Sequence, residues 1–272
     1  MTILRWNGQT AIDTPDELAI EEPLEIRVRG RAISVTMRTP GHDAELAAGF
    51  LLSEGIIHNQ RDVLRVEHCS RNEDDNVLNV LLAPAVTVDF DSLTRHVFAS
   101  SSCGLCGKAT IESVNQQLAP VESALKISAS VIASLPEKMR AQQATFDRTG
   151  GLHAAAIFDA SGNCIVLRED VGRHNAVDKV VGHCLLNGLL PLTDYLLLVS
   201  GRSSFEIMQK ALAARVPIVA AISAPSSLAT DFAEASNQTL IGFLSAQRMN
   251  VYTHPRRVEF DVECHAYDAA SK

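Results

Sequence analysis

The alternation of apolar and polar residues predicts strands in the first third of the chain. The stretch LEIRVRGRAISVTMR (24–38) has apolar residues at alternating positions on either side of Gly30, which is typical of a hairpin. VLNVLLA (77–83) predicts a further strand. The first 20 residues lack a comparable pattern, and we expect them to form a loose arm.

A helix is expected between these strands, over residues 39–57, because its apolar side chains recur at helical spacing. Thr39 suits the N-cap, Pro40 the first turn and Gly55 the stop. Two more helices are expected further along the chain. One ends at Pro120, and the other begins at residue 134 with Ser134 as its cap.

From residue 150 the pattern becomes a regular alternation of buried strands and amphipathic helices. Strands are expected at 153–159, 164–170, 195–200, 217–223 and 239–243, and helices at 173–188, 203–215 and 226–238. Continuously apolar strands such as YLLLVS are typical of sheets covered on both faces. The pattern predicts a layered α/β domain with a largely parallel sheet.

The fold class is therefore α/β, with a smaller mixed α+β domain ahead of the layered C-terminal domain. We place the arm at 1–20, the α+β domain at 21–125, the α/β domain at 126–257 and a tail at 258–272.

Composition narrows the function. The net charge of −8 argues against general nucleic-acid binding, although it leaves room for a local basic pocket. The N-terminus has no signal-peptide pattern, and no apolar run approaches the length of a membrane span. A cytoplasmic protein with reduced thiols is expected.

Six cysteines are present, and only Cys103 and Cys106 are closely spaced, in SSCGLCGKA (101–109). The other four are expected to be small buried hydrophobic residues. A zinc site would need a second ligand pair, which is missing, and a deaminase-type site would need a different spacing upstream. A thioredoxin-like pair would follow a buried strand. A glycine-flanked loop instead suits a mobile thiol carrier, with Lys108 able to favour the thiolate.

Two strand ends carry similar turns. YLLLVS is followed by Gly201, Arg202 and Ser203, and PIVAAIS by a turn containing Ser226, with a helix after each. Helix N-termini at the carboxyl ends of parallel strands favour anions. The alternatives are a phosphate or nucleotide pocket with Arg202 as its charge, or simple helix capping by the serines.

The stretch EDVGRHNAVDK (169–179) places many charges at a strand-to-helix junction. One interpretation is that Asp170, Arg173 and His174 line a site, and the other is a solvated helix start with weak ion pairs. His153 is expected to be a satisfied strand-end histidine.

Six segments in fixed order match a known family: SSCGLCGKA, TGGLHAAAIFD, EDVGRHNAVDK, GRSSFEIMQKA, AISAPSSLA and VYTHPRR. Over residues 20–257 the chain closely resembles the FdhD family, the formate dehydrogenase accessory sulfurtransferases. The resemblance implies a sulfur carrier that takes sulfur from a cysteine desulfurase and passes it to the molybdenum cofactor, a bis(molybdopterin guanine dinucleotide) complex, before the cofactor enters formate dehydrogenase.

The resemblance also implies roles for particular residues. Cys103 matches the persulfide-carrying cysteine and Cys106 its companion. The cofactor-contacting segment maps onto Phe243, Leu244, Ser245, Ala246, Gln247 and Arg248, with Arg248 expected at a phosphate. The α/β domain should resemble the cytidine deaminase fold without its zinc, and the protein should be a homodimer without a structural metal.

Two other functions stay open on the residues alone. A non-catalytic chaperone would hold the molybdenum cofactor and have no need of the thiols. A zinc-stabilised binding module would use the remaining cysteines and histidines, such as His183, Cys184, Cys264 and His265.

Overall fold

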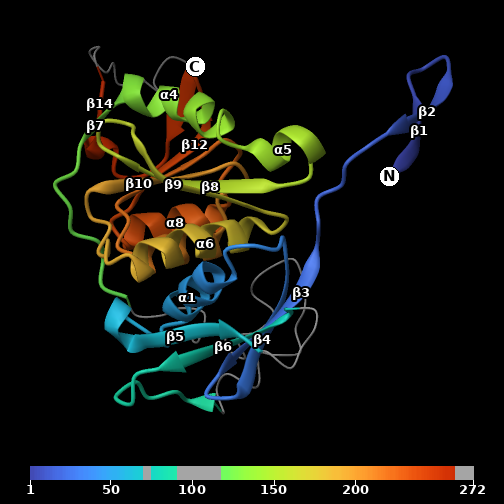
Figure 1. Cartoon of the computed structure of the whole chain (residues 1–272). Helices are drawn as coiled ribbons and strands as arrows, with labels where there is room; N and C mark the ends of the chain where they lie inside the picture. Colours follow the sequence, from blue (N-terminus) through green and yellow to red (C-terminus); the bar gives the residue numbers. More distant parts are fainter. Residues whose placement is uncertain (70–74, 91–117, 261–272) are drawn as a thin grey trace.

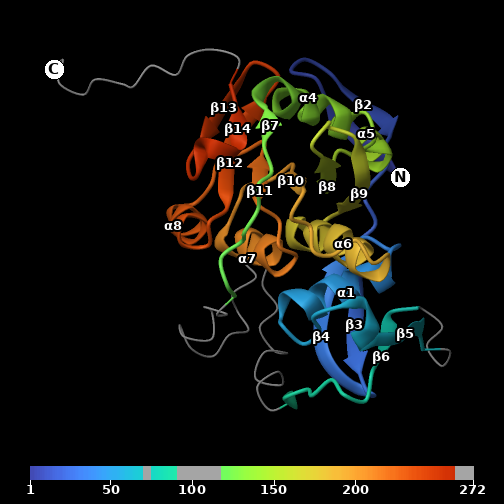
Figure 2. The same cartoon turned by 90° about the vertical axis from the view of Figure 1, so that its left-hand side faces the viewer.

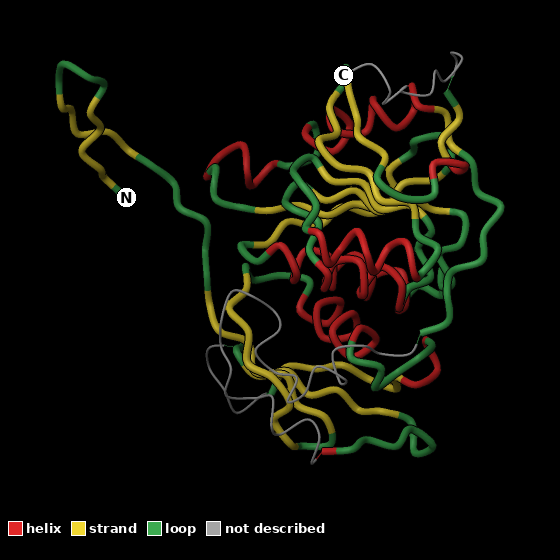
Figure 3. The backbone as a smooth tube through the Cα atoms, turned by 180° about the vertical axis from the view of Figure 1, so that it is seen from behind, coloured by secondary structure: helices red, strands yellow, loops and turns green. Residues whose placement is uncertain are grey.

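The computed structural model describes residues 1–69, 75–90 and 118–260. The body is layered: a large sheet lies above three helices, which lie above a single helix and a small sheet (Figure 1). Seen from behind, the helices fill the space between the two sheets (Figure 3). The expected thiol loop, the helix before Pro120 and the tail from residue 261 lie outside the described residues.

The large sheet has the order β13-β12-β11-β10-β8-β9 in the described part of the chain. Its strands are β8 (His153–Asp159), β9 (Cys164–Asp170), β10 (Tyr195–Val199), β11 (Ile218–Ala221), β12 (Thr239–Ser245) and β13 (Arg248–Val251). Among the described strands of this sheet, only β10, β11 and β12 pair in parallel. The prediction of a largely parallel sheet is wrong, because the short turns joining β8 to β9 and β12 to β13 permit only antiparallel pairing.

Both faces of the large sheet are covered, as its apolar strands predict. Alternate residues of β8 point to opposite sides: Ala154 and Phe158 join the cluster beneath α4, and Ala155 and Ile157 join the cluster around the other helices. Those helices are α6 (Arg173–Leu186), α7 (Phe205–Ala213) and α8 (Ser227–Ala235). Figure 2 shows α6 below the β8–β9 side of the sheet and α8 on the β12 side.

The helix on the other face, α4 (Ala129–Arg140), begins earlier than predicted; α5 (Ala144–Thr149) follows it. The N-cap of α4 is Ser128 and not Ser134, and the Ser128 hydroxyl accepts a hydrogen bond from the Ser130 amide. Pro136 therefore lies inside the helix. The burial of Ile132, Leu135 and Met139 explains why the helix persists through the proline.

The small sheet, of order β4-β3-β6-β5 among the described residues, comprises β3 (Glu22–Val28), β4 (Arg31–Arg38), β5 (Val63–His68) and β6 (Val77–Leu82). The hairpin around Gly30 is confirmed, and the positive φ of Gly30 is the conformation that its turn requires.

The predicted first helix is α1 (Asp43–Ser53), with the 3-10 turn η1 (Gln60–Asp62) after it. The helix α1 begins at Asp43 because Thr39 forms hydrogen bonds with the second half of the chain and does not cap the helix. The Thr39 hydroxyl accepts from the Val171 amide, and its carbonyl accepts from Lys179. Gly55 ends the helix with a positive φ, as predicted.

The two halves meet where α1 crosses α6. A Cβ added at Gly49 would overlap the backbone carbonyl of Asp178, and one at Gly182 would overlap that of Glu45. Glycine at both positions therefore allows the helix backbones to touch. Polar groups surround this crossing: Arg168 and His183 both contact the Glu45 carboxylate.

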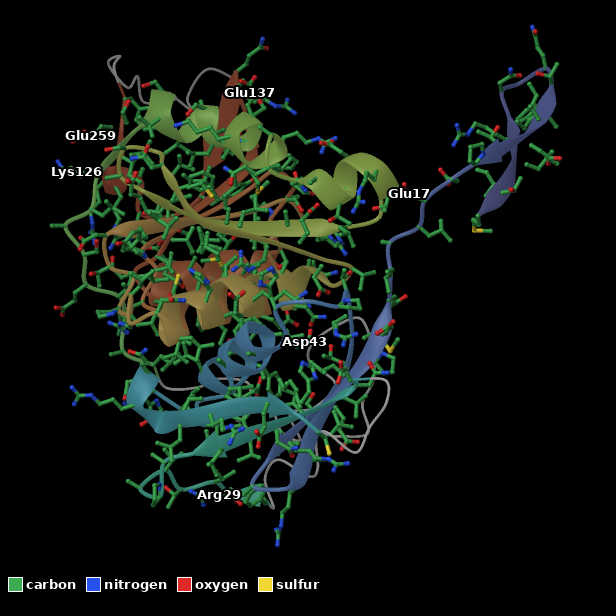
Figure 4. All side chains as sticks on the ribbon, in the orientation of Figure 1. Glu17, Arg29, Asp43, Lys126, Glu137 and Glu259 are labelled. Carbon is green, nitrogen blue, oxygen red and sulfur yellow. The ribbon has the colours of Figure 1, made fainter. Side chains whose placement is uncertain are left out.

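The two ends of the described chain differ in how they contact the body. Residues 1–20, expected to be a loose arm, contain a hairpin of β1 (Thr2–Trp6) and β2 (Ala11–Pro15) that stands away from the body (Figure 1). Val258 and Glu259 were assigned to the tail from sequence, but they form the strand β14 after the turn η2 (Pro255–Arg257). β14 pairs with β7 (Ile127–Ser128), and the burial of Val258 holds it there. Lys126 and Glu259 lie side by side there (Figure 4), with 3.8 Å between Nζ and Oε1.

No helix among the described residues is long and apolar enough to cross a membrane. The division into domains at residues 125 and 257 stays a prediction.

Candidate functional site

The two strand-end turns predicted from sequence lie beside one another at the carboxyl edge of β10 and β11. Ser203 and Pro225 form a parallel bridge, and the Ser226 amide donates to the Ser203 carbonyl over 3.0 Å. The turns are thus one continuous backbone surface.

The capping alternative holds for one turn and fails for the other. The Ser226 hydroxyl accepts from the Ala229 amide at 3.2 Å and caps α8. Ser204 precedes α7, but its side chain makes no capping bond and its hydroxyl instead meets His174. The first-turn amides of α7 therefore have no N-cap side chain as an acceptor in the described part of the chain, which is the arrangement that attracts an anion.

Two buried polar atoms at this edge have no hydrogen-bond partner among the described residues: Ser203 Oγ and Arg173 Nε. A buried donor left without a partner costs about 1–3 kcal/mol. The Arg173 side chain lies against the first turn, since a Cβ at Gly201 would sit 3.6 Å from Arg173 Cδ and 3.3 Å from His153 Nδ1. A ligand with acceptor atoms would satisfy Arg173 at this point.

The two histidines of the edge favour the neutral form. Burial, then the charges of Lys210, Arg173 and His153, lower the pKa of His174 to about 3. His174 Nε2 is 3.2 Å from Ser204 Oγ and 3.9 Å from a Glu206 carboxylate oxygen. Since the ring is neutral near pH 7, the Glu206 contact is no ion pair. Burial and Arg173 also lower the pKa of His153.

The end of β12 completes the edge. The Phe243 amide donates to the Ser223 carbonyl at 3.1 Å, and the register of β12 against β13 shifts at this point. Phe243 has a φ of 51° and is 38% exposed. A bulky residue in left-handed backbone is strained, and such strain often occurs at functional sites. Gly242 permits this turn, because a Cβ there would press on Pro225.

The other residues predicted in this segment differ in exposure, and Ser245 is half-buried. Ala246, Gln247 and Arg248 are exposed in and beside the β12–β13 turn. Leu244 is 1% exposed and belongs to the core beneath α4, so its side chain is not available at the edge. Arg202 is exposed in the first turn, where it can move toward a ligand.

The charged stretch 169–179 proves to serve two purposes. Asp170 is fully buried, 2.7 Å from Lys179, and accepts from the amides of Thr39 and Gly172. The interpretation that Asp170 lines the site is wrong, because its carboxylate is already fully engaged between the two halves of the chain. Arg173 and His174 face the turns.

The thiol pair, Cys103 and Cys106, lies outside the described residues, as does Cys264. Burial raises the pKa of Cys164 and raises that of Cys184 to about 12, so both stay protonated and unreactive near neutral pH. Cys184 is buried as predicted, whereas Cys69 and Cys164 are half-buried. Within the described ranges no group of three histidine, cysteine or acidic residues is arranged to hold a metal.

Sequence reasoning missed two features of this edge. Ser204, and not Ser203, is the residue before α7. His153 lies against the Gly201 turn, although it was expected to be only a satisfied strand-end histidine. The only signal for His153 was its position as the first residue of a strand that runs antiparallel to β10, which places it at the carboxyl edge.

The fold and this edge define a layered α/β protein with unpartnered polar groups, Arg173 Nε and Ser203 Oγ, at the ends of three parallel strands. Comparison with known families then identifies it further: the model of the FdhD/NarQ family matches residues 19–259, and the chain belongs to that family. The resemblance predicted from the six ordered segments is confirmed.

Named relatives are similar over nearly their whole length. "Sulfur carrier protein FdhD" of Streptomyces coelicolor is 50% identical over 264 residues, covering 94% of each chain. The protein of the same name from Mycobacterium tuberculosis is 49% identical over 262 residues, covering 93% of this chain and 95% of its own. A solved protein from Desulfotalea psychrophila, named as a formate dehydrogenase accessory protein, shares the fold with a TM-score of 0.78 and 24% identity, over 95% of this chain and 98% of its own.

Proposed function

We propose that this protein is a sulfur carrier that accepts sulfur from a cysteine desulfurase on Cys103 and delivers it to the molybdenum cofactor of formate dehydrogenase. The observation that carries the proposal is the 50% identity, over almost the whole chain, to a protein named as a sulfur carrier. The setting is the cytoplasm, and the active form is a homodimer, as the family resemblance implies.

The first step transfers one sulfur atom. The Cys103 thiolate attacks the terminal sulfur of the donor's persulfide, the donor's S–S bond breaks, and the donor cysteine leaves as a thiolate. Cys103 then carries the persulfide. Cys164 and Cys184 are poor alternatives, because burial keeps their thiols protonated.

Release of the sulfur as sulfide needs two electrons, which explains the second thiol. Attack of Cys106 on Sγ of Cys103 expels HS⁻ and leaves a Cys103–Cys106 disulfide, so the electrons come from the two cysteines. The chain must then be reduced before the next cycle, and cytosolic thiol reductants supply that reduction.

The molybdenum cofactor is the substrate of the second step, and its guanine dinucleotide arms carry pyrophosphates. Arg173, Arg202 and the first-turn amides of α7 suit a pyrophosphate, and Arg248 lies at the same edge of the sheet, paired with Ser245 at the end of β12. The orphaned Arg173 Nε supports this fit. The exposed Phe243 ring offers a face for an aromatic base.

The decisive experiment is mass spectrometry of the full chain after incubation with a cysteine desulfurase and cysteine. We expect the mass of one added sulfur atom on Cys103, none in Cys103→Ala, and normal first loading in Cys106→Ala. Cys184→Ala serves as a control for a thiol that should not load. Loading that is unchanged in Cys103→Ala would refute the assignment.

A non-catalytic cofactor chaperone is the alternative, and the unpaired Arg173 and Ser203 at the strand ends favour it equally. The two functions differ in what the thiols do. Formate dehydrogenase maturation that survives the double change Cys103→Ala and Cys106→Ala, but is lost in Arg173→Ala, would favour the chaperone.

A further inference from the structure

A second feature of the molecule lies at the opposite, amino edge of the large sheet, where α6 and α7 end. A hollow of about 460 Å³ opens there between η1 and the two helix ends. Its floor is apolar and includes Leu185, Leu190 and Ala213. A volume of this size accommodates a small molecule or a few side chains of a partner protein.

The rim of the hollow is basic, although the whole chain carries a net charge of −8. Among the described residues that line it, His58, Arg61 and Arg215 are basic and none is acidic. The nearest carboxylate in sequence, Asp62, is turned inward and accepts from the amides of His58 and Asn59. The hollow is thus a local positive site on an acidic protein, which favours an acidic partner.

The basic side chains of the rim that lack a described partner are exposed. Arg61 and His58 are both exposed, and neither side chain has a partner in the part of the chain that the structure describes. Gln60 is engaged differently, since its amide nitrogen donates to the Leu186 carbonyl at the end of α6. Arg61 is therefore the positive charge on the rim that is most accessible to a carboxylate of a partner protein.

The hollow also lies where the chain returns from the stretch that contains the two thiols. Arg215, on its rim, donates to the carbonyls of Ala119 and Pro120 at 2.5 and 2.7 Å. An extended chain covers about 3.3–3.6 Å per residue, so Cys106 is tethered within roughly 45 Å of this anchor. This limit allows the thiols to reach a protein bound at the hollow, which lies at the end of α6 opposite Arg173.

We infer that this hollow is the docking surface for the sulfur-donating protein, and that it receives an apolar side chain flanked by carboxylates. The inference rests on the proposed function. Donor and cofactor then bind at opposite edges of the large sheet, so that sulfur can be loaded while the cofactor edge is occupied.

The test compares two sulfur sources on the full-length protein. One is a persulfidated cysteine desulfurase, which must dock, and the other is glutathione persulfide, which needs no docking surface. In Arg61→Glu we expect loading of Cys103 from the desulfurase to slow about tenfold and to lose most of its salt dependence. Loading from glutathione persulfide should not change.

Two further variants sharpen the result. Ala213→Trp fills the hollow without altering its charge and should also slow loading from the desulfurase alone. Arg148→Glu makes the same charge change on the exposed surface of α5, where its only described ion-pair contact is Glu17 at 3.9 Å, and should load normally.

The outcomes separate the docking surface from the function itself. If neither sulfur source loads Cys103 in the unaltered protein, the proposed function fails. If the desulfurase loads it, and Arg61→Glu and Ala213→Trp accept sulfur from the desulfurase at the unaltered rate, the docking surface is wrong. Equal slowing in Arg148→Glu also overturns it, because the effect would then be one of net charge.

Discussion

Two groups of polar side chains meet at the start of α6, and they differ in how completely they are paired. On one side, Asp170 is fully buried and bonded to Lys179, Thr39, Gly172 and Asn175. On the other side, Arg173 has a buried Nε with no partner among the described residues. The same sequence stretch supplies both.

The difference teaches how to separate structural charges from functional ones. A paired buried ion has its desolvation offset by its partners, so it holds the two halves of the chain in register. An unpaired buried donor is costly unless something arrives to accept from it. Charge density alone cannot make this distinction, whereas a count of partners can.

Of the changes that test this difference, Lys179→Met should have the largest effect, a loss of folding stability. It leaves the Asp170 carboxylate buried without its cation, and we expect a loss of about 3–5 kcal/mol in the free energy of unfolding. Urea denaturation measures this. Lys126→Met is the control, since Lys126 is exposed and 3.8 Å from Glu259, and should change stability by less than about 1 kcal/mol. Equal effects would show that the paired network has no structural role.

The next effect should come from Gly182→Ala. The added methyl group would collide with the Glu45 backbone and push α1 from α6, at a cost of about 2–3 kcal/mol. Gly151→Ala is the matched control: its methyl group would lie 3.2 Å from the side-chain Cβ of Ala19 and no closer than 3.9 Å to a backbone atom outside its chain neighbours. Thermal unfolding of both variants tests the crossing, and a loss no larger than that of the control would contradict it.

Arg173→Ala, unlike Lys179→Met, should weaken ligand binding and leave folding stability nearly unchanged. We expect binding of inorganic pyrophosphate, measured by calorimetry, to weaken roughly 10–100-fold, because a charge-assisted hydrogen bond is lost. Stability should change by less than about 1 kcal/mol, since Arg173 Nε has no described partner to lose. Unchanged binding would remove Arg173 from the site.

The smallest effect is a pH dependence from His174. Its pKa of about 3 in the folded protein lies below the ordinary value of 6.5, so the unfolded chain binds the proton more readily. Stability from this group is present above pH 6.5 and is lost as the pH falls toward 3. We expect His174→Gln to reduce the loss between pH 7 and pH 5 by about 1–2 kcal/mol. His153 and His42 contribute with the same sign, so the comparison with the unaltered protein is essential.

Much of the fold could be predicted from the sequence. The hairpin around Gly30, the strands and helices after residue 150 and the stop at Gly55 follow from apolar spacing and glycine placement, which act over a few residues. The start of α4 and the start of α1 could not be predicted. Burial of Ile132 keeps α4 helical from Ala129, ahead of Pro136, and contacts from Thr39 to the other half of the chain move the start of α1 to Asp43.

The position of the candidate site could be predicted from the sequence, but the residues whose side chains face it could not. Strand ends followed by serine-rich turns indicated the edge, and the turns do lie together. The sequence could not show that Ser226 is used as a cap, that Leu244 faces the core, or that Phe243 is forced into left-handed backbone. Each depends on neighbours that are distant in sequence.

By itself, the sequence determined which segments become strands and helices, which thiols are close enough to cooperate, and to which family the chain belongs. These properties are set by side chains a few residues apart or by the order of motifs. Only the tertiary structure decided which charges of the stretch 169–179 are paired and which are left facing the strand ends. Pairing depends on atoms that meet only when the two halves pack, and the free energy of a buried charge is fixed by those partners and not by its place in the chain.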